Sequence, residues 1–287
     1  MTLTPARQSA RDARATAHSP RTLGRMAARA LWLELALEPK PGLVSLRDTG
    51  AHTDMDARTF VRSLFALRPH FARLAAAGAF NAPFATLRAI GIEAEAAMLA
   101  ATGGVNTHRG AIFALGLLAA AAGRAQARDE PVTDATLRAH LRAAWGDALA
   151  AHSPPPGVPS HGAAAAARHG AGGARREAAR AFPAVFDVAL PALRAARRRG
   201  RDERCARIAA LFALLAHVDD TNVLHRGGLV ALALVQARGR AFVHAADPLA
   251  FAARTHREFV TRRLSPGGSA DLLAAALFVD ALQDTRP

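Results

Sequence analysis

The chain contains a single lysine, Lys40, which lies between two prolines in the segment Glu38-Pro39-Lys40-Pro41-Gly42-Leu43-Val44. Proline fixes φ and removes an amide donor, so this segment cannot be the interior of a helix and leaves the lysine little backbone freedom. Lysine is a compact point charge that suits a phosphate group or a shifted pKa. The alternative is an ordinary solvated loop lysine, but the polar segments that follow favour a binding role.

Two aspartates follow in the turn Gly50-Ala51-His52-Thr53-Asp54-Met55-Asp56. On an extended loop, residues two positions apart point to the same side, so Asp54 and Asp56 could act together in acid–base chemistry. Asp56 could instead be the N-cap of the helix that follows it. Both roles for Asp56 remain open from the sequence.

A second acidic pair, Asp219-Asp220, follows an apolar helical stretch that ends near Val218. Negative charge at the C-terminal end of a helix is unfavourable unless a cation compensates it. Oxygen ligands beside phosphate groups suit Mg²⁺, so this pair predicts a magnesium site. Glu93 and Glu95 share another predicted helix, and their spacing allows only one of them to face the same site.

Glycine-flanked polar segments recur at the predicted ends of helices. A glycine-rich loop that leads into a helix presents unpaired amides and partial positive charge, which favours anion binding. The alternative for such loops is ordinary helix capping. The residues that could bind substrate there are Asn106, His108 and Arg109 in 103–110, Asn222, His225 and Arg226 in 219–228, and Gly267, Gly268 and Ser269 in 265–271.

Helical periodicity dominates the chain, and strand alternation is scarcely visible. We therefore expect an all-α fold, with one compact multi-helix catalytic domain over residues 22–287 and the active site in loops at helix ends. Residues 1–21, rich in arginine, serine and alanine, are expected to form a disordered basic tail. The predicted helices cover residues 22–37, 57–76, 84–101, 108–122, 133–151, 161–170, 174–181, 184–199, 203–218, 226–238, 247–262 and 268–283.

Composition limits the class of protein. The one cysteine, Cys205, excludes an intrachain disulfide, and the spacing of histidines offers no zinc motif. No apolar run reaches the roughly 18 residues that span a bilayer, so we expect a soluble, cytoplasmic protein that does not enter a membrane. The net charge of +14 suits polyphosphate ligands or nucleic acid. Because aromatic residues make up only 5% of the chain and the arginines are scattered, nucleic-acid binding is not expected.

Taken together, these segments resemble the triphosphoribosyl-dephospho-CoA synthase family. The matching motifs are PKPGLV at 39–44, the GxHxDMD turn at 50–56, GVNTHRG at 104–110, DTNVLHRGG at 220–228 and SPGGSADLLA at 265–274. The resemblance extends from about Glu34 to Leu282, with the motifs in the family's order. The segment from His161 to Pro183 also matches, although Ala181 stands where the family usually has glycine.

The resemblance implies a pentosyl transfer from ATP to 3′-dephospho-CoA with release of adenine. It implies that Asp54 is the base, with His52 or Asp56 as alternatives, and that Lys40, Arg109 and Arg226 neutralise the triphosphate. Mg²⁺ would be the cofactor. The implied metal ligands are Asp219, Asp220 and Glu95, and the implied substrate-binding residues include Asn106, His108, Asn222, His225, Gly267, Gly268 and Ser269.

The product would be a prosthetic-group precursor, which a nucleotidyltransferase attaches to an acyl carrier subunit of citrate lyase or malonate decarboxylase. Ser45 and the Gly50-Ala51-His52 turn favour the malonate decarboxylase branch. Two other readings remain: a Mg²⁺-dependent glycohydrolase of the ADP-ribosyl type, and a non-enzymatic nucleic-acid-binding protein.

Overall fold

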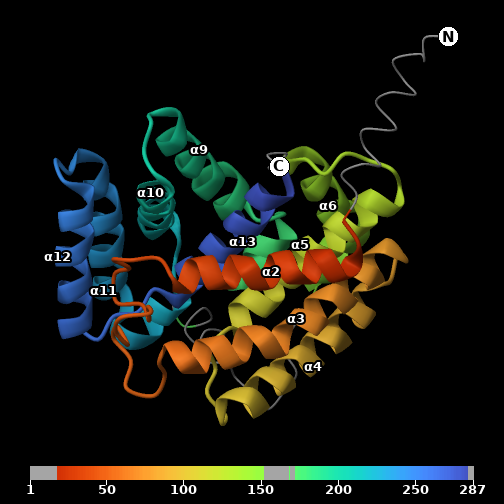
Figure 1. Cartoon of the computed structure of the whole chain (residues 1–287), viewed down its shortest axis with the longest axis horizontal. Coiled ribbons are helices and arrows are strands. Elements are labelled where there is room, and N and C mark those ends of the chain that lie inside the picture. Colours follow the sequence, from red (N-terminus) through yellow and green to blue (C-terminus); the bar gives the residue numbers. More distant parts are fainter. Residues whose placement is uncertain (1–17, 152–167, 169–171, 284–287) are drawn as a thin grey trace.

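A computed structural model describes residues 18–151, 168 and 172–283. The expected all-α class is confirmed, because the described residues contain helices and no strand. The elements are α2 (Pro20–Leu35), α3 (Ala57–Ala79), α4 (Phe84–Thr102), α5 (Arg109–Ala127), α6 (Asp134–Ala151), α8 (Gly173–Ala179), the π-helical turn η1 (Ala184–Ala189), α9 (Leu190–Arg198), α10 (Glu203–His217), α11 (Thr221–Ala241), the 3₁₀ turn η2 (Phe242–His244), α12 (Pro248–Thr261) and α13 (Gly267–Gln283) (Figure 1).

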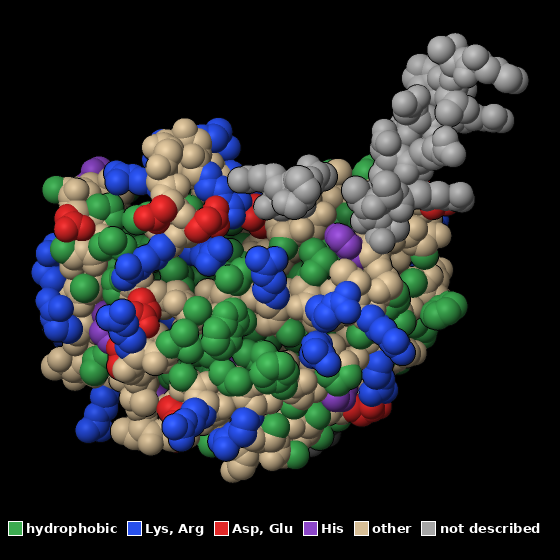
Figure 2. Space-filling view, viewed as in Figure 1, with side chains coloured by type: hydrophobic (Ala, Val, Ile, Leu, Met, Phe, Trp, Pro, Cys, Tyr) green, Lys and Arg blue, Asp and Glu red, His purple; other side chains and the backbone are tan. Residues whose placement is uncertain are grey.

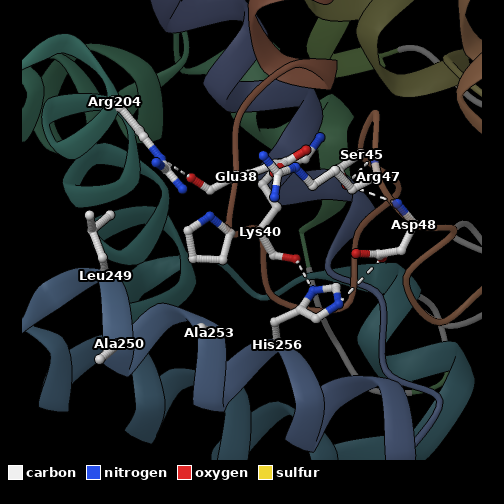
Figure 3. Close-up of a pocket in the computed structure, with 11 residues that line it drawn as sticks. Glu38, Lys40, Ser45, Arg47, Asp48, Arg204, Leu249, Ala250, Ala253 and His256 are labelled. Carbon is white, nitrogen blue, oxygen red and sulfur yellow. Dashed lines mark hydrogen bonds and ion pairs between the residues drawn. The ribbon is translucent and has the colours of Figure 1, made fainter.

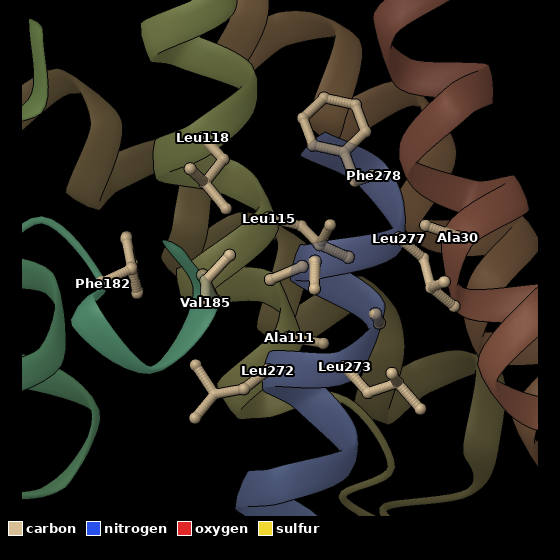
Figure 4. Packing of buried hydrophobic residues seen from close by; sticks show 14 of the residues in the cluster. Ala30, Ala111, Leu115, Leu118, Phe182, Val185, Leu272, Leu273, Leu277 and Phe278 are labelled. Carbon is tan, nitrogen blue, oxygen red and sulfur yellow. The ribbon is translucent and has the colours of Figure 1, made fainter. Parts of the chain in front are cut away.

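The core is built around α5 and α13. Both helices are apolar on nearly every face and are surrounded by other helices: α3 packs on α5, α2 lies against α3 and α13, and α10 packs on α11 and α9. Figure 4 shows Leu115 and Leu118 of α5 beside Leu273 and Phe278 of α13. A helix that is hydrophobic all round belongs in the centre of a bundle.

The α3–α5 crossing depends on glycine. An added side-chain carbon at Gly78 would overlap the backbone of Ala120, and one at Gly123 would overlap the backbone of Ala75. The two helices therefore approach at backbone distance along the C-terminal half of α5.

One described helix, α5, is long and apolar enough to cross a membrane, but 72% of the relevant window is buried inside the bundle. Burial of this kind is typical of the central helix of a folded domain. The apolar character of α5 is thus accounted for by the core.

The predicted helix boundaries agree with the structure to within a few residues, with two exceptions. The helix predicted at 108–122 continues to Ala127. The helix predicted from residue 226 begins at Thr221, because Asp220 serves as its N-cap. The predicted helix at 161–170 and His161 lie outside the described residues, except for residue 168, as do residues 1–17 of the predicted tail; α2 begins at Pro20.

Candidate functional site

A cavity of about 1380 Å³ opens where the ends of several helices meet. Residues from every one of the motif segments line it, although these segments are far apart in the sequence. The sequence-predicted residues on its wall are Lys40, His52, Asp54, Glu95, Asn106, His108, Arg109, Asp219, Asp220, Asn222, His225, Arg226, Gly267 and Gly268.

Two predicted residues, Asp56 and Ser269, do not line the cavity. The Asp56 carboxylate accepts hydrogen bonds from the backbone N–H and the hydroxyl of Thr59, both at 2.8 Å, and so caps α3. This is the structural alternative that the sequence left open. Ser269 is buried and donates its backbone N–H and its hydroxyl to Asp220 Oδ2, at 2.8 and 3.0 Å.

Lys40 is buried and already has a charged partner. Its Nζ lies 2.6 Å from Glu34 Oε1, and the residue is 2% exposed. Burial lowers the pKa of Lys40, and the neighbouring Glu34 carboxylate opposes that effect. Lys40 is therefore not an ordinary solvated loop lysine. Its ammonium group is paired with the Glu34 carboxylate.

Lys40 also borders a second, smaller cavity of about 390 Å³. Figure 3 shows His256 at its floor, with Nδ1 donating to the Lys40 carbonyl at 2.6 Å and Nε2 lying 3.3 Å from Asp48 Oδ1. Arg47 pairs with Glu38 at the rim. These contacts hold the Lys40 loop against α12, so the lysine side chain enters the large cavity from a fixed backbone.

His108 lies at the N-terminal end of α5 and is only 3% exposed. Its Nδ1 is 2.6 Å from the Ser63 hydroxyl, while its Nε2 has no partner within the described part of the chain. Burial, followed by the positive charge of Lys40, lowers the pKa of His108 to about 3. The imidazole is thus neutral at neutral pH, with one unpartnered nitrogen in the wall of the cavity.

Asp220 has a structural role that corrects the charge argument made from the sequence. Its Oδ1 accepts from the backbone N–H groups of Asn222 and Val223, and its Oδ2 accepts both hydrogen bonds from Ser269. α10 ends at His217, so Asp220 sits at the favourable N-terminal end of α11 and not in an unfavourable position at the end of α10. It needs no cation to offset a helix dipole.

The three predicted magnesium ligands do not form one ligand set. Asp219 is exposed and accepts a hydrogen bond from Gln236 at 3.2 Å, whereas Glu95 pairs with Arg109 on the α4–α5 side of the cavity. Within residues 18–151, 168 and 172–283, no group of three or more carboxylates, histidines or cysteines is arranged to hold a metal ion. These residues therefore do not fit a resident Mg²⁺.

Arg226 joins the motif segments to each other. Its Nη1 donates to the carbonyls of Ala51 and Arg263, both at 3.1 Å, and its Nη2 lies 3.2 Å from His52 Nδ1. Burial and the Arg226 charge lower the pKa of His52, whose Nδ1 is 3.5 Å from Asp54 Oδ1. Arg226 thus fixes the His52–Asp54 turn beside the first turn of α11.

Close packing also explains the glycines at the start of α13. A side-chain carbon added at Gly267 would lie 2.7 Å from Asn222 Nδ2, and one at Gly268 would lie 3.2 Å from Asp220 Oδ2. His225 lies one turn further along α11 on the same wall of the cavity. The DTN segment at the start of α11 and the SPGG segment at the start of α13 therefore pack directly against each other.

Sequence reasoning gave no role to three further acidic residues of the cavity wall, Glu34, Glu177 and Asp271. Burial raises the pKa of Asp271 well above its ordinary value, and the charges of Glu34 and Asp220 raise it further. Asp271 belongs to the SPGGSAD motif, so its position three residues after Gly268 was the signal that could have identified it. Glu34 lies in an ordinary helical stretch and carries no such signal.

Three comparisons with known proteins bear on this site. A family model described as ATP:dephospho-CoA triphosphoribosyl transferase matches residues 20–287. A probable 2-(5″-triphosphoribosyl)-3′-dephosphocoenzyme-A synthase of Stutzerimonas stutzeri is 42% identical over 284 residues, which cover 96% of each chain. The synthase of Pectobacterium atrosepticum is 43% identical over 256 residues, or 86% of this chain and 84% of the relative. No solved structure is significantly similar.

Proposed function

This chain belongs to the ATP:dephospho-CoA triphosphoribosyl transferase family, and we propose that its large cavity joins the 5-triphosphoribosyl group of ATP to the 2′-hydroxyl of 3′-dephospho-CoA, with release of adenine. The observation that carries the proposal is the meeting of five distant motif segments around one cavity. The cavity of about 1380 Å³ exceeds the roughly 300–1,000 Å³ typical of a site for one small molecule, which suits two nucleotides.

Loss of adenine leaves positive charge at the ribose C1′, and the incoming hydroxyl must lose a proton. We assign the base to Asp54, with His52 as its neighbour. The Asp54 carboxylate lines the cavity, is not used in a helix cap, and is held next to His52 by the contacts of Arg226. Asp56 is left out of this role because its Oδ1 caps α3.

The phosphate groups require positive charge, which the α4–α5–α8 side of the cavity supplies. Arg109 lies there at the start of α5, and Arg88, Arg176 and Arg180 line the same cavity. Asn106 accepts a hydrogen bond from the Arg109 backbone N–H at 3.1 Å and so shapes this end of the helix. We assign this side to polyphosphate binding and the Lys40–His108 region to the ribose and base.

Mg²⁺ is proposed to enter as the counter-ion of the ATP triphosphate. The carboxylates that the sequence predicted as ligands do not form a ligand set, so a resident metal is not part of the proposal. Equilibrium dialysis of the protein against Mg²⁺ without ATP should show no stoichiometric binding. Stoichiometric, ATP-independent binding that Asp219→Asn abolishes would contradict this view.

The decisive experiment incubates the pure protein with ATP, Mg²⁺ and 3′-dephospho-CoA and measures adenine by chromatography. Adenine release that depends on dephospho-CoA, with a product heavier by the triphosphoribosyl group, is expected. Adenine release without the acceptor, accompanied by free ribose triphosphate, would instead identify a glycohydrolase. Asp54→Asn should lower turnover by about a hundredfold or more, and Asp147→Asn, on the exposed face of α6, should not.

We propose further that the product passes to a nucleotidyltransferase that acts on an acyl carrier subunit in the cytoplasm, where both substrates occur. The malonate decarboxylase branch is proposed from Ser45 and the Gly50-Ala51-His52 turn. Ser45 is buried and its hydroxyl accepts from the backbone of Arg47 and Asp48, so it shapes this loop. Because both branches would use the same product, the test is deletion of the gene in its own host: growth on malonate should be lost and growth on citrate kept, and the reverse would contradict the assignment.

A further inference from the structure

Asp271 connects the starts of two central helices. It lies near the start of α13, just after the first turn, and its carboxyl group accepts a hydrogen bond from the backbone N–H of Ala111 in α5. An added side-chain carbon at Gly110 would overlap Asp271 Oδ2, so the absence of a side chain at this position makes room for the carboxyl group. Its accessible atoms face the cavity, which it lines together with Gly110.

The interior around Asp271 contains more acidic groups than basic ones. Glu34 and Asp220 interact with it electrostatically, and Lys40 is the buried cation of this region. Glu34 has the lysine as its partner, and Asp220 accepts hydrogen bonds from four donors. Asp271 has one backbone donor, so among the three carboxyl groups it is the one that holds a proton most readily, in line with the upward shift of its pKa.

An unpartnered polar atom points to a ligand at the same helix end. His108 lies two residues before Gly110, and its buried Nε2 has no partner within the described residues. The Ser63 hydroxyl lies 2.6 Å from Nδ1, and we assign the hydroxyl proton to this bond, which leaves the ring proton on Nε2. A proton-bearing carboxyl group and an imidazole N–H in one wall are two donors for a ligand that presents acceptor nitrogens.

On the basis of the proposed transferase function, we propose that Asp271 is the catalytic general acid that protonates adenine as it leaves, while His108 Nε2 donates a hydrogen bond to the same base. The C1′–N9 bond breaks, its electron pair stays on adenine, and the Asp271 proton moves to a ring nitrogen. The acceptor oxygen bonds to C1′, and its proton goes to Asp54. Exchange with water then restores both carboxyl groups.

The test compares two donors in the Asp271→Asn variant. Asparagine keeps the size and an acceptor oxygen but cannot deliver this proton. With ATP, kcat should fall by about a hundredfold or more, the usual contribution of general acid–base catalysis. With nicotinamide riboside 5′-triphosphate, whose base leaves as a neutral molecule without needing a proton, the loss should be less than about tenfold. The matched control is Asp147→Asn, with far-UV circular dichroism to confirm folding.

Wild-type turnover of ATP by Asp271→Asn, or equal losses on both donors, would overturn the acid role and indicate positioning only. A second readout uses ATP alone. The wild-type kcat/KM should decline at high pH as Asp271 loses its proton, and this limb should be missing in the variant. A persisting limb would assign it to another facing group, Glu34, Asp220, Lys40 or His108, and overturn the proposal. Absence of adenine release by the wild-type protein would instead refute the transferase function itself.

Gly110→Ala offers a check that keeps every carboxyl group. Its methyl group would displace the Asp271 carboxyl, and a shift of about an ångström can cost on the order of a hundredfold in rate. We expect this loss with ATP and a smaller one with the nicotinamide donor. An unchanged ATP rate in Gly110→Ala would contradict the proposed geometry.

Discussion

Lys40 and Glu34 form a buried ion pair whose contribution to the stability of the protein depends on both partners being present. Removing one partner of such a pair leaves an uncompensated buried charge and costs about 3–5 kcal/mol, whereas replacing both with apolar groups is often neutral. Lys40→Met should therefore destabilise the protein by about that amount, and Lys40→Met with Glu34→Leu should recover much of it. Urea unfolding of the wild type, Lys40→Met, Glu34→Leu and the double variant measures this, and losses that add up in the double variant would refute the coupling.

His108 makes the folded protein sensitive to acid. Its pKa is lowered to about 3 in the folded state, whereas the unfolded chain has the ordinary value of about 6.5. Between these values the unfolded state binds the extra proton, so stability falls as the pH drops below about 6.5. From pH 7 to 5 this group alone should cost roughly 2 kcal/mol.

The measurement is urea unfolding of the wild type and His108→Gln at both pH values. The glutamine variant should lose less stability on acidification by about that difference, since the other titrating groups are common to both proteins. Identical pH dependence would show that His108 is protonated in the folded state.

At the scale of elements, the Asp220 N-cap fixes the start of α11, which forms part of the cavity wall. Asp220→Asn keeps one carbonyl oxygen but turns an amide group towards the donors of Ser269 or α11, which should cost about 1–3 kcal/mol. Asp219→Asn, at an exposed position, should change stability by less than about 0.5 kcal/mol. Thermal unfolding of both variants distinguishes this cap from a surface carboxylate. Equal melting temperatures would remove the capping role.

The crossing of α3 and α5, where the two backbones lie close together, is a second feature at this scale. Gly123→Ala would force a methyl group into the backbone of Ala75, and overpacking of this kind costs about 1–3 kcal/mol. Gly146→Ala in α6 meets only Arg142 at 4.0 Å and should stabilise by about 0.5–1 kcal/mol through helix propensity. Chemical denaturation of the two variants should show effects of opposite sign.

The turn between α8 and η1 also requires an unusual backbone conformation. Ala181, which replaces the glycine usual in the family, has a left-handed φ of 57° and is fully buried. Glycine adopts this conformation without steric penalty, which explains why it suits the position. Alanine adopts here the left-handed conformation for which glycine is better suited.

At the scale of the whole molecule, the net charge of +14 should favour the encounter with polyanionic substrates. Figure 2 shows basic side chains spread over the visible face and not gathered into one stripe. Because exposed charges are screened within about 10 Å at 0.1 M salt, KM for ATP and dephospho-CoA should rise several-fold from about 0.05 to 0.5 M NaCl while kcat changes little. A salt-independent KM would show that only charges inside the cavity matter.

The sequence by itself determined the all-α class, the helix boundaries to within a few residues and the segments that line the cavity. These follow from local information, because helical periodicity, prolines and glycines act within a few residues of one another. The motif residues Lys40, His108 and Asn222 were found this way, and the structure places all three at the same cavity.

Only the tertiary structure decided how those side chains are used. It pairs Lys40 with Glu34, makes Asp220 a helix cap, turns Arg226 into a link between loops, and places Asp271 against Gly110. Each of these outcomes depends on which donors and charges from distant segments surround a group once it is buried. That environment sets both the pKa and the partners of a buried polar group, and no local pattern of residues contains it.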